Sequence, residues 1–170
     1  LPQSAINNLR FSRFLTALNL PNQNATQFGN YYLEQLSEKS VFMEGGADLL
    51  EKHAQPYKLG IITNGLKQVQ RPKLVKSGLA DYFEVIVVSD EIGISKPQPA
   101  IFEHAFEKMN FPAKDRVLMI GDSLNSDILG GINYGIDTCW YNFKQKENTT
   151  SFKPTYVINH LKELKTLAII

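Results

Sequence analysis

Two aspartates, Asp122 and Asp127, lie in the stretch GDSLNSDILGG, directly after the apolar run VLMI. A carboxylate at the end of a buried strand is costly, because desolvation disfavours its charged form. We therefore expect a positive group beside them. Mg²⁺ binds through oxygen and needs only one or two protein carboxylates beside a phosphate, so Asp122 is a candidate metal ligand. Asp127 could hold a metal-bound water, pair with a lysine or complement the dipole of the following helix.

A suitable cation occurs in SKPQPAIF, where Lys96 directly precedes Pro97. The prolines fix the backbone and so aim the lysine, whose ammonium could bind a phosphate oxygen as a point charge. The alternative is a solvated lysine in a turn, which is the position of most lysines.

A further polar group ends the apolar run in KLGIITNG. The Thr63 hydroxyl, the Asn64 amide and the sharp turn at Gly65 could offer donors to an anion, helped by N–H groups at the start of the next helix. Taken alone, these residues fit an ordinary Asn-Gly turn at a strand exit equally well.

From Lys58 onward, short apolar runs alternate with helical patterns. The predicted strands are KLGIIT, FEVIVV, VLMI, TCWY and TYVI, and the predicted helices lie near 67–76, 100–109, 126–134 and 159–167. This alternation is typical of α/β proteins with a doubly wound parallel sheet covered on both faces. Ligands bind such sheets beyond the carboxyl ends of the strands, where the polar groups above are expected.

The first forty residues have a different pattern. We expect two helices that pack together, at 5–19 and 25–39, and a further helix near 47–54. Most of the aromatic side chains of the pair are expected in the core between the helices, although they could instead line a pocket; they are Phe11, Phe14, Phe28, Tyr31 and Tyr32.

Composition argues against several classes of protein. The 170 residues carry a net charge of +1 and no basic face for nucleic acid. No apolar run approaches the roughly twenty residues of a membrane span. Cys139 is the only cysteine, which rules out a disulfide within the chain and favours a reducing compartment such as the cytoplasm. We expect a cytoplasmic protein that is a monomer or a weak homodimer.

Taken together, ITNG, SKPQPAIF and GDSLNSDILGG resemble the second, third and fourth motifs of the haloacid dehalogenase-like hydrolases, in the same order and at strand ends. The segment TCWYN, and the segment EIGISKP that leads to Lys96, resemble the pyrimidine 5′-nucleotidases of that superfamily. The resemblance implies a Rossmann-type core at 41–170. At 1–40 it implies part of the helical cap, where substrate selectivity resides in such enzymes.

The function implied by the resemblance is Mg²⁺-dependent hydrolysis of a phosphomonoester through an aspartyl-phosphate. The implied substrate-binding residues are Thr63, Asn64, Gly65 and Lys96. The implied catalytic residues are Thr63, Lys96 and Asp127. Asp122 is the implied Mg²⁺ ligand, and Asp127 is implied to lie just behind the metal.

The first motif of the family, an Asp-x-Asp that carries the nucleophile and the acid/base aspartate, occurs nowhere in these residues. We therefore expect a further strand and further cap helices before Leu1. That strand would be central, between KLGIIT and VLMI, and its loss would leave two buried edges of unpaired backbone groups. Residues 1–170 alone are then expected to be poorly stable, inactive and weak in Mg²⁺ binding.

The resemblance implies a nucleoside 5′-monophosphate as the expected substrate. The acidic pair in GDSLNSD argues against a haloacid dehalogenase, which needs no metal. A phosphatase of another small metabolite, such as phosphoglycolate, is an alternative because the cap decides the substrate. From a different class, a non-catalytic relative could use the same fold to bind a nucleotide or a protein.

Overall fold

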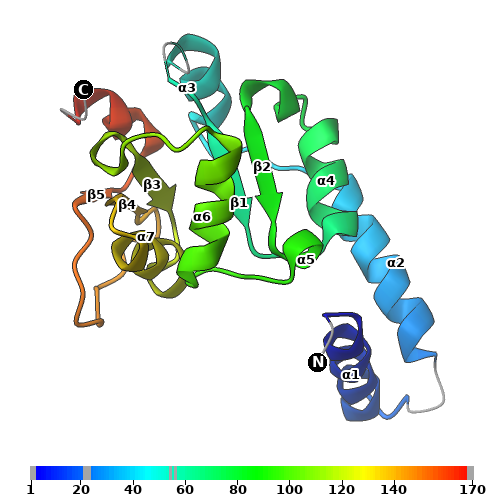
Figure 1. The fold of residues 1–170 in the computed structure, drawn as a ribbon. Helices are drawn as coiled ribbons and strands as arrows, with labels where there is room; N and C mark the ends of the chain where they lie inside the picture. Colours follow the sequence, from blue (N-terminus) through cyan, green and yellow to red (C-terminus); the bar gives the residue numbers. More distant parts are fainter. Residues whose placement is uncertain (1–2, 21–23, 54, 56, 168–170) are drawn as a thin grey trace.

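The computed structural model describes residues 3–20, 24–53, 55 and 57–167 (Figure 1). The α-helices are α1 (Gln3–Ala17), α2 (Ala25–Glu38), α3 (Gly46–His53), α4 (Lys67–Lys76), α5 (Ser89–Ile92), α6 (Pro99–Lys108) and α7 (Leu129–Tyr134). The strands are β1 (Gly60–Thr63), β2 (Val85–Val88), β3 (Leu118–Gly121), β4 (Asp137–Tyr141) and β5 (Tyr156–Ile158). Short 3₁₀-helices are η1 (Ala80–Tyr82), η2 (Lys114–Arg116) and η4 (Leu161–Thr166), and η3 (Leu124–Ile128) is a π-helical turn.

Every strand pairing in the described part of the chain is parallel. β1 pairs with β2, with Thr63 opposite Val88. β4 lies between β3 and β5. Among the described residues β1 and β3 share no ladder, so the strands form a two-stranded and a three-stranded sheet. The predicted parallel α/β architecture is confirmed.

One apolar core underlies both sheets. Helix α6, which lies in front of the strands in Figure 1, contributes the fully buried Ile101 and Phe102. Val87 of β2 belongs to the same buried cluster, and Ile62 of β1 and Met119 of β3 pack against it. The helix begins at Pro99, whose fixed φ suits the first turn of a helix. Both β1 and β3 therefore pack against the buried cluster that contains the apolar stripe of α6, although the two strands are not paired.

Consecutive residues of β4 are buried, which shows that both faces of this strand are covered. Thr138 is 1% exposed and the next residue, Cys139, is 0% exposed, yet successive side chains of a strand point to opposite faces. Burial raises the pKa of the Cys139 thiol to about 11. The thiol is therefore protonated at neutral pH and cannot serve as a nucleophile.

Helices α1 and α2 pack through a narrow aromatic seam. The Phe11 ring lies 5.5 Å from that of Phe28 and 5.3 Å from that of Tyr32, and the absent side chain of Gly29 leaves it room. Phe11 is buried, but the other four aromatic side chains remain 40–60% exposed. The prediction that most of them are buried between the helices is therefore wrong, because a single pair of helices covers only one narrow stripe of each.

The C-terminal end of α2 and the residues that follow it bind α4 through a hydrogen bond and an ion pair. The Ser40 hydroxyl donates to the carbonyl oxygen of Lys73 at 3.1 Å, and Glu38 forms an ion pair with Lys76. Figure 1 shows α1 and α2 at one end of the molecule, away from β4 and β5. A division between a cap and a core near residue 40 stays a prediction. Among the described residues, none of the helices is both long and apolar enough to cross a bilayer.

Two predicted helices differ in kind from the observed ones. The pattern at 126–134 predicts one helix, but the chain makes the π-helical turn η3 before α7 begins. At 159–167 the structure has the 3₁₀-helix η4, in which the Glu163 side chain accepts from the backbone N–H of His160 at 2.7 Å. Apolar spacing does not separate these helix types, because their periods differ little over one or two turns.

The close contact between α6 and α7 depends on Gly130. A Cβ atom at this position would lie 2.6 Å from the Phe102 ring and 3.3 Å from the Cα of Pro97. We expect Gly130→Ala to lower the free energy of unfolding by about 1–3 kcal/mol, since a packed ring and a backbone atom cannot both yield. Urea denaturation of the purified chain measures this change.

Gly46→Ala is the matched control. Its Cβ would meet only Leu161, at an ordinary 3.6 Å. We expect stability to be unchanged or raised by up to about 1 kcal/mol, because alanine restricts the unfolded chain. Equal destabilisation by both substitutions would contradict the packing argument for Gly130.

Candidate active site

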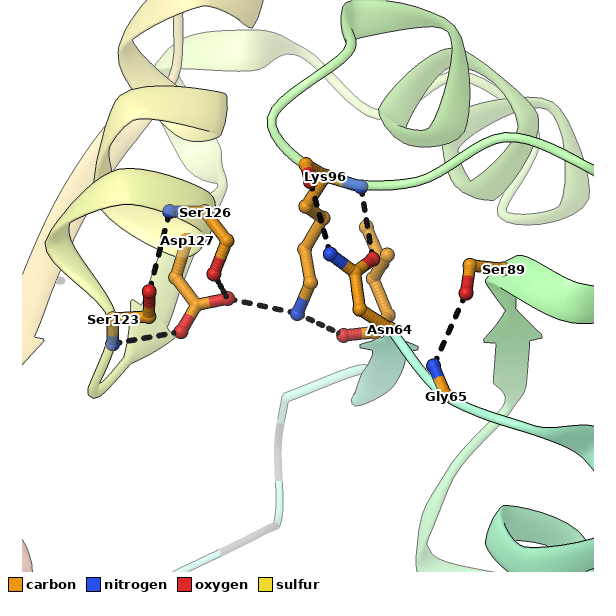
Figure 2. Close-up of polar contacts among 8 residues, drawn as sticks. Asn64, Gly65, Ser89, Lys96, Ser123, Ser126 and Asp127 are labelled. Carbon is orange, nitrogen blue, oxygen red and sulfur yellow. Dashed lines mark hydrogen bonds and ion pairs between the residues drawn. The ribbon is translucent and has the colours of Figure 1, made fainter. Parts of the chain in front are cut away.

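The Lys96 ammonium lies between the carboxyl ends of β1 and β3 (Figure 2). It donates to the carbonyl oxygen of Ile62 and forms an ion pair with Asp127, with 2.8 Å between Nζ and Oδ1. The two side chains are only 9% and 8% exposed. Lys96 is therefore not a solvated surface lysine, and its charge is compensated by an aspartate from another part of the chain.

The π-helical turn η3 places Asp127. Its Oδ2 accepts from the backbone N–H of Ser123 at 3.0 Å, while its Oδ1 receives the Lys96 ammonium and a longer contact from the Ser126 hydroxyl. Gly121 makes this possible, because a Cβ atom there would lie 2.3 Å from Oδ2. The spacing in GDSLNSD thus folds the second aspartate back over the end of β3.

Asn64 and Gly65 are held by neighbouring loops (Figure 2). The Asn64 side chain both donates to and accepts from the backbone of Lys96, and the N–H of Gly65 donates to the Ser89 hydroxyl at 3.1 Å. Sequence reasoning missed Ser89. The signal was available, since Ser89 directly follows the apolar run VIVV, as Thr63 ends GIIT.

Thr63 and Asp122 stand at the same edge, at or just past the ends of β1 and β3. The Asp122 carboxylate is exposed, and its backbone carbonyl accepts from the Trp140 indole at 3.1 Å. Within the described ranges, neither the Thr63 hydroxyl nor the Asp122 carboxylate has a hydrogen-bond partner. Both groups are therefore open to a ligand.

A shallow pocket of about 60 Å³ adjoins Asp122. Its other lining residues come from the end of β4 and the loop that follows: Trp140, Tyr141, Asn142, Phe143, Lys144 and Lys146. The segment TCWYN, which contains three of these residues, carries a resemblance in the sequence but no predicted site role. No motif marks residues 143–146, and only the fold brings them beside Asp122.

The described residues contain no group of three or more His, Cys, Asp or Glu side chains placed to hold a metal. Both carboxylate oxygens of Asp127 are already engaged by protein donors. Of the described residues at this edge, Asp122 is the one that offers a free carboxylate. That suits Mg²⁺, which takes most of its ligands from water and phosphate, better than a metal that needs a full set of protein ligands.

The groups at this sheet edge are suited to binding charged ligands. A buried ammonium is fixed between two oxygens, and a hydroxyl and a carboxylate with no protein partner lie at the same edge of the sheet. Lys96 keeps one of its three ammonium hydrogens beyond those directed at Ile62 and Asp127. Such an edge can bind an anion and, beside it, a divalent cation.

Comparisons with known proteins agree with this chemistry. The family model of the haloacid dehalogenase-like hydrolases matches residues 5–141. The pyrimidine 5′-nucleotidase YjjG of Escherichia coli is 37% identical over 159 residues, which are 94% of this chain and 71% of that protein. The pyrimidine 5′-nucleotidase PynA of Streptococcus pneumoniae is 34% identical over 158 residues, 92% of this chain and 66% of that protein.

Among solved structures, the magnesium-bound HAD-hydrolase YfnB of Bacillus subtilis superposes with a TM-score of 0.91 at 34% identity, covering all of this chain and 74% of that one. The chain thus spans about two thirds to three quarters of the length of these relatives.

The buried ion pair between Lys96 and Asp127 is expected to contribute measurably to the free energy of unfolding. We expect Asp127→Asn, which keeps the shape but removes the charge, to lower the free energy of unfolding by about 3 kcal/mol, because it leaves the Lys96 ammonium buried without its counter-ion. Urea denaturation at neutral pH and moderate salt measures the difference.

Glu84→Gln is the matched control, since Glu84 and Lys58 form an ion pair at 3.1 Å with side chains 41% and 66% exposed. Removing a solvated pair should cost less than about 1 kcal/mol. If Asp127→Asn cost no more than Glu84→Gln, the Lys96–Asp127 pair would not be the buried contact described above.

Proposed function

The chain belongs to the haloacid dehalogenase-like hydrolases, and from this premise we propose that it is the greater part of a Mg²⁺-dependent phosphomonoesterase acting on nucleoside 5′-monophosphates. The observation that carries the proposal is the fixed Lys96 ammonium, with Thr63 and Asp122 free at the same sheet edge. Family membership alone does not separate a phosphatase from other hydrolases, whereas these side chains favour a phosphate and a divalent cation.

Each residue has a role in the proposal. The remaining hydrogen of the Lys96 ammonium and the Thr63 hydroxyl bind oxygens of the phosphate. Asp127 orients the ammonium and balances its charge, so the cation stays at this edge when no anion is bound. The Lys96 ammonium and the Asp127 carboxylate are fixed in advance by hydrogen bonds and their ion pair, which is how a protein stabilises charge that develops during a reaction.

Asp122 is the residue proposed to hold Mg²⁺. The ion would neutralise phosphate charge at the reaction centre. The fit rests on the exposed, unpartnered Asp122 carboxylate at the end of β3. The magnesium-bound structure of the similar YfnB supports this choice of ion.

We propose further that a strand bearing the nucleophilic aspartate lies between β1 and β3. Three observations support this placement: the 170 residues contain no Asp-x-Asp, β1 and β3 share no ladder in the described part, and Lys96 bonds the outer edge of β1. The carbonyl of Leu59 accepts from Glu84 beside β2, so strand alternation turns Ile62 toward the opposite side. The backbone of Ile62 therefore faces the position proposed for the strand.

The nucleotide substrate is supported by YjjG and PynA, both named as pyrimidine 5′-nucleotidases. The half-exposed aromatic side chains of α1 and α2 add to this support, since flat rings suit a nucleobase. A phosphatase of another small metabolite such as phosphoglycolate, and a non-catalytic nucleotide- or protein-binding relative, are the competing functions.

The metal role of Asp122 is tested in the protein as its gene encodes it. We expect Asp122→Asn to abolish Mg²⁺-dependent release of phosphate from UMP, with a loss of at least about a hundredfold in kcat, because a neutral amide is a poor Mg²⁺ ligand. Asp115→Asn is the matched control, since Asp115 is exposed and precedes the opposite end of β3. Unchanged turnover in Asp122→Asn removes this residue from the metal site.

Substrate choice needs its own measurement. Parallel assays with UMP, dUMP, dTMP and phosphoglycolate should give the highest kcat/KM for a pyrimidine nucleotide. A clear preference for phosphoglycolate would favour the metabolite phosphatase. Absence of turnover with every substrate, despite tight nucleotide binding, would favour the non-catalytic relative.

The proposed strand is tested by amide hydrogen exchange at Ile62. In residues 1–170 alone we expect the Ile62 amide to exchange at least about a hundredfold faster than that of Ile61, which faces β2, because no strand pairs with it. In the gene product as encoded, the two amides should be similarly protected. Strong protection of Ile62 in residues 1–170 alone would mean that the edge of β1 is already covered.

A further inference from the structure

We propose that Asn64 is a positioning residue that fixes the backbone of Lys96, and that it acts on the bound anion only through that lysine. The catalytic consequence rests on the function proposed above. The contact between Asn64 and Lys96 does not, because it is a feature of the fold.

The contact consists of two reciprocal hydrogen bonds (Figure 2). Asn64 Nδ2 donates to the carbonyl oxygen of Lys96 at 2.9 Å, and the N–H of Lys96 donates to Asn64 Oδ1 at 2.9 Å. Rotating the amide by half a turn would place donor against donor and acceptor against acceptor, so only one orientation satisfies both bonds. The side chain at the end of β1 therefore holds a residue 32 positions away along the chain.

The backbone of Lys96 must be fixed if its ammonium is to reach a defined position. It lies in the loop between α5 and α6, and its long side chain has several rotatable bonds. Fixing both the N–H and the C=O of Lys96 fixes the direction in which that side chain leaves the backbone. Its ammonium can then meet the Ile62 carbonyl and the Asp127 carboxylate together. Asn64 thus fixes the backbone from which the Lys96 side chain extends, and Asp127 fixes the position of its Nζ atom.

These bonds also limit what else Asn64 can do. Its oxygen is engaged by Lys96, and one of its two amide hydrogens is used. Turning the amide toward a phosphate would break the contact that aims the lysine. This differs from the direct substrate contact that the sequence implies for Asn64, and it gives the asparagine a role separate from that of Thr63.

The same bonding pattern occurs at the end of β4. Asn142 Nδ2 donates to the carbonyl oxygen of Lys146, and the N–H of Lys146 donates to Asn142 Oδ1, both at 2.9 Å. That pair closes a loop of a few residues, whereas Asn64 joins two loops from separate parts of the sheet. Asn142 therefore offers a control with identical chemistry that does not touch Lys96.

The test uses the acetylation rate of Lys96, measured by mass spectrometry after brief exposure of the gene product as encoded to acetic anhydride. In Asn64→Ala we expect this rate to rise about tenfold, because loss of two hydrogen bonds frees the loop and exposes the amine. Asn142→Ala should leave the Lys96 rate within about twofold of the original, even if it lowers the overall stability. Asn64→Asp keeps the acceptor but not the donor and should give an intermediate rate.

Two results would overturn the proposal. One is an unchanged Lys96 rate in Asn64→Ala, and the other is an equal rise in Asn142→Ala, which would trace the effect to general destabilisation. In the gene product as encoded, Asn64→Ala should lower kcat for phosphate release while KM changes little, with partial rescue in Asn64→Asp. If the unaltered protein releases no phosphate, the proposed function fails, and the acetylation rates still decide the role of Asn64.

Discussion

The arrangement of the sheet edge depends on one buried ion pair, between the Lys96 ammonium and the Asp127 carboxylate. Because Lys96 also bonds the Ile62 carbonyl, this side chain ties the end of β1 to the loop after β3, although the strands are not paired in the described part of the chain. Below the edge, the apolar stripe of α6 connects the same two sheets. A buried ammonium is tolerated only if its partners are held in place, so the surrounding structure is constrained by this requirement.

Several local features serve that requirement. Gly121 has no side chain where Asp127 folds back, and the π-helical turn brings the Asp127 carboxylate to the N–H of Ser123. On the other side, Asn64 anchors the backbone from which the lysine extends. Together they explain why glycine, asparagine and aspartate occur at strand ends, where a longer or apolar side chain would either clash or leave the ammonium uncompensated.

Much of this organisation could be predicted from the sequence, because it follows from strand ends. Strands β1 and β3, which the apolar runs GIIT and VLMI indicate, end in Thr63 and Gly121, and the parallel topology brings such ends to one edge. The role of Asn64 could not be predicted, because its partner is distant in sequence and is a backbone group, which any residue carries. Likewise, helical spacing shows which residues of α1 and α2 are apolar but not what covers them, so most of the five aromatic side chains were expected to be buried, whereas Phe11 alone of the five is.

The edge also divides its polar groups into two kinds. Lys96, Asp127 and Asn64 bind one another, whereas Thr63 and Asp122 have no such partner in the described ranges. The first kind gives the site a fixed positive centre, and the second leaves ligands that a substrate or metal can complete. Stability does not require a partner for Asp122, since pairing an exposed carboxylate would contribute little to the fold. The unpaired carboxylate beside a rigid cation is therefore free to take the binding role proposed for it.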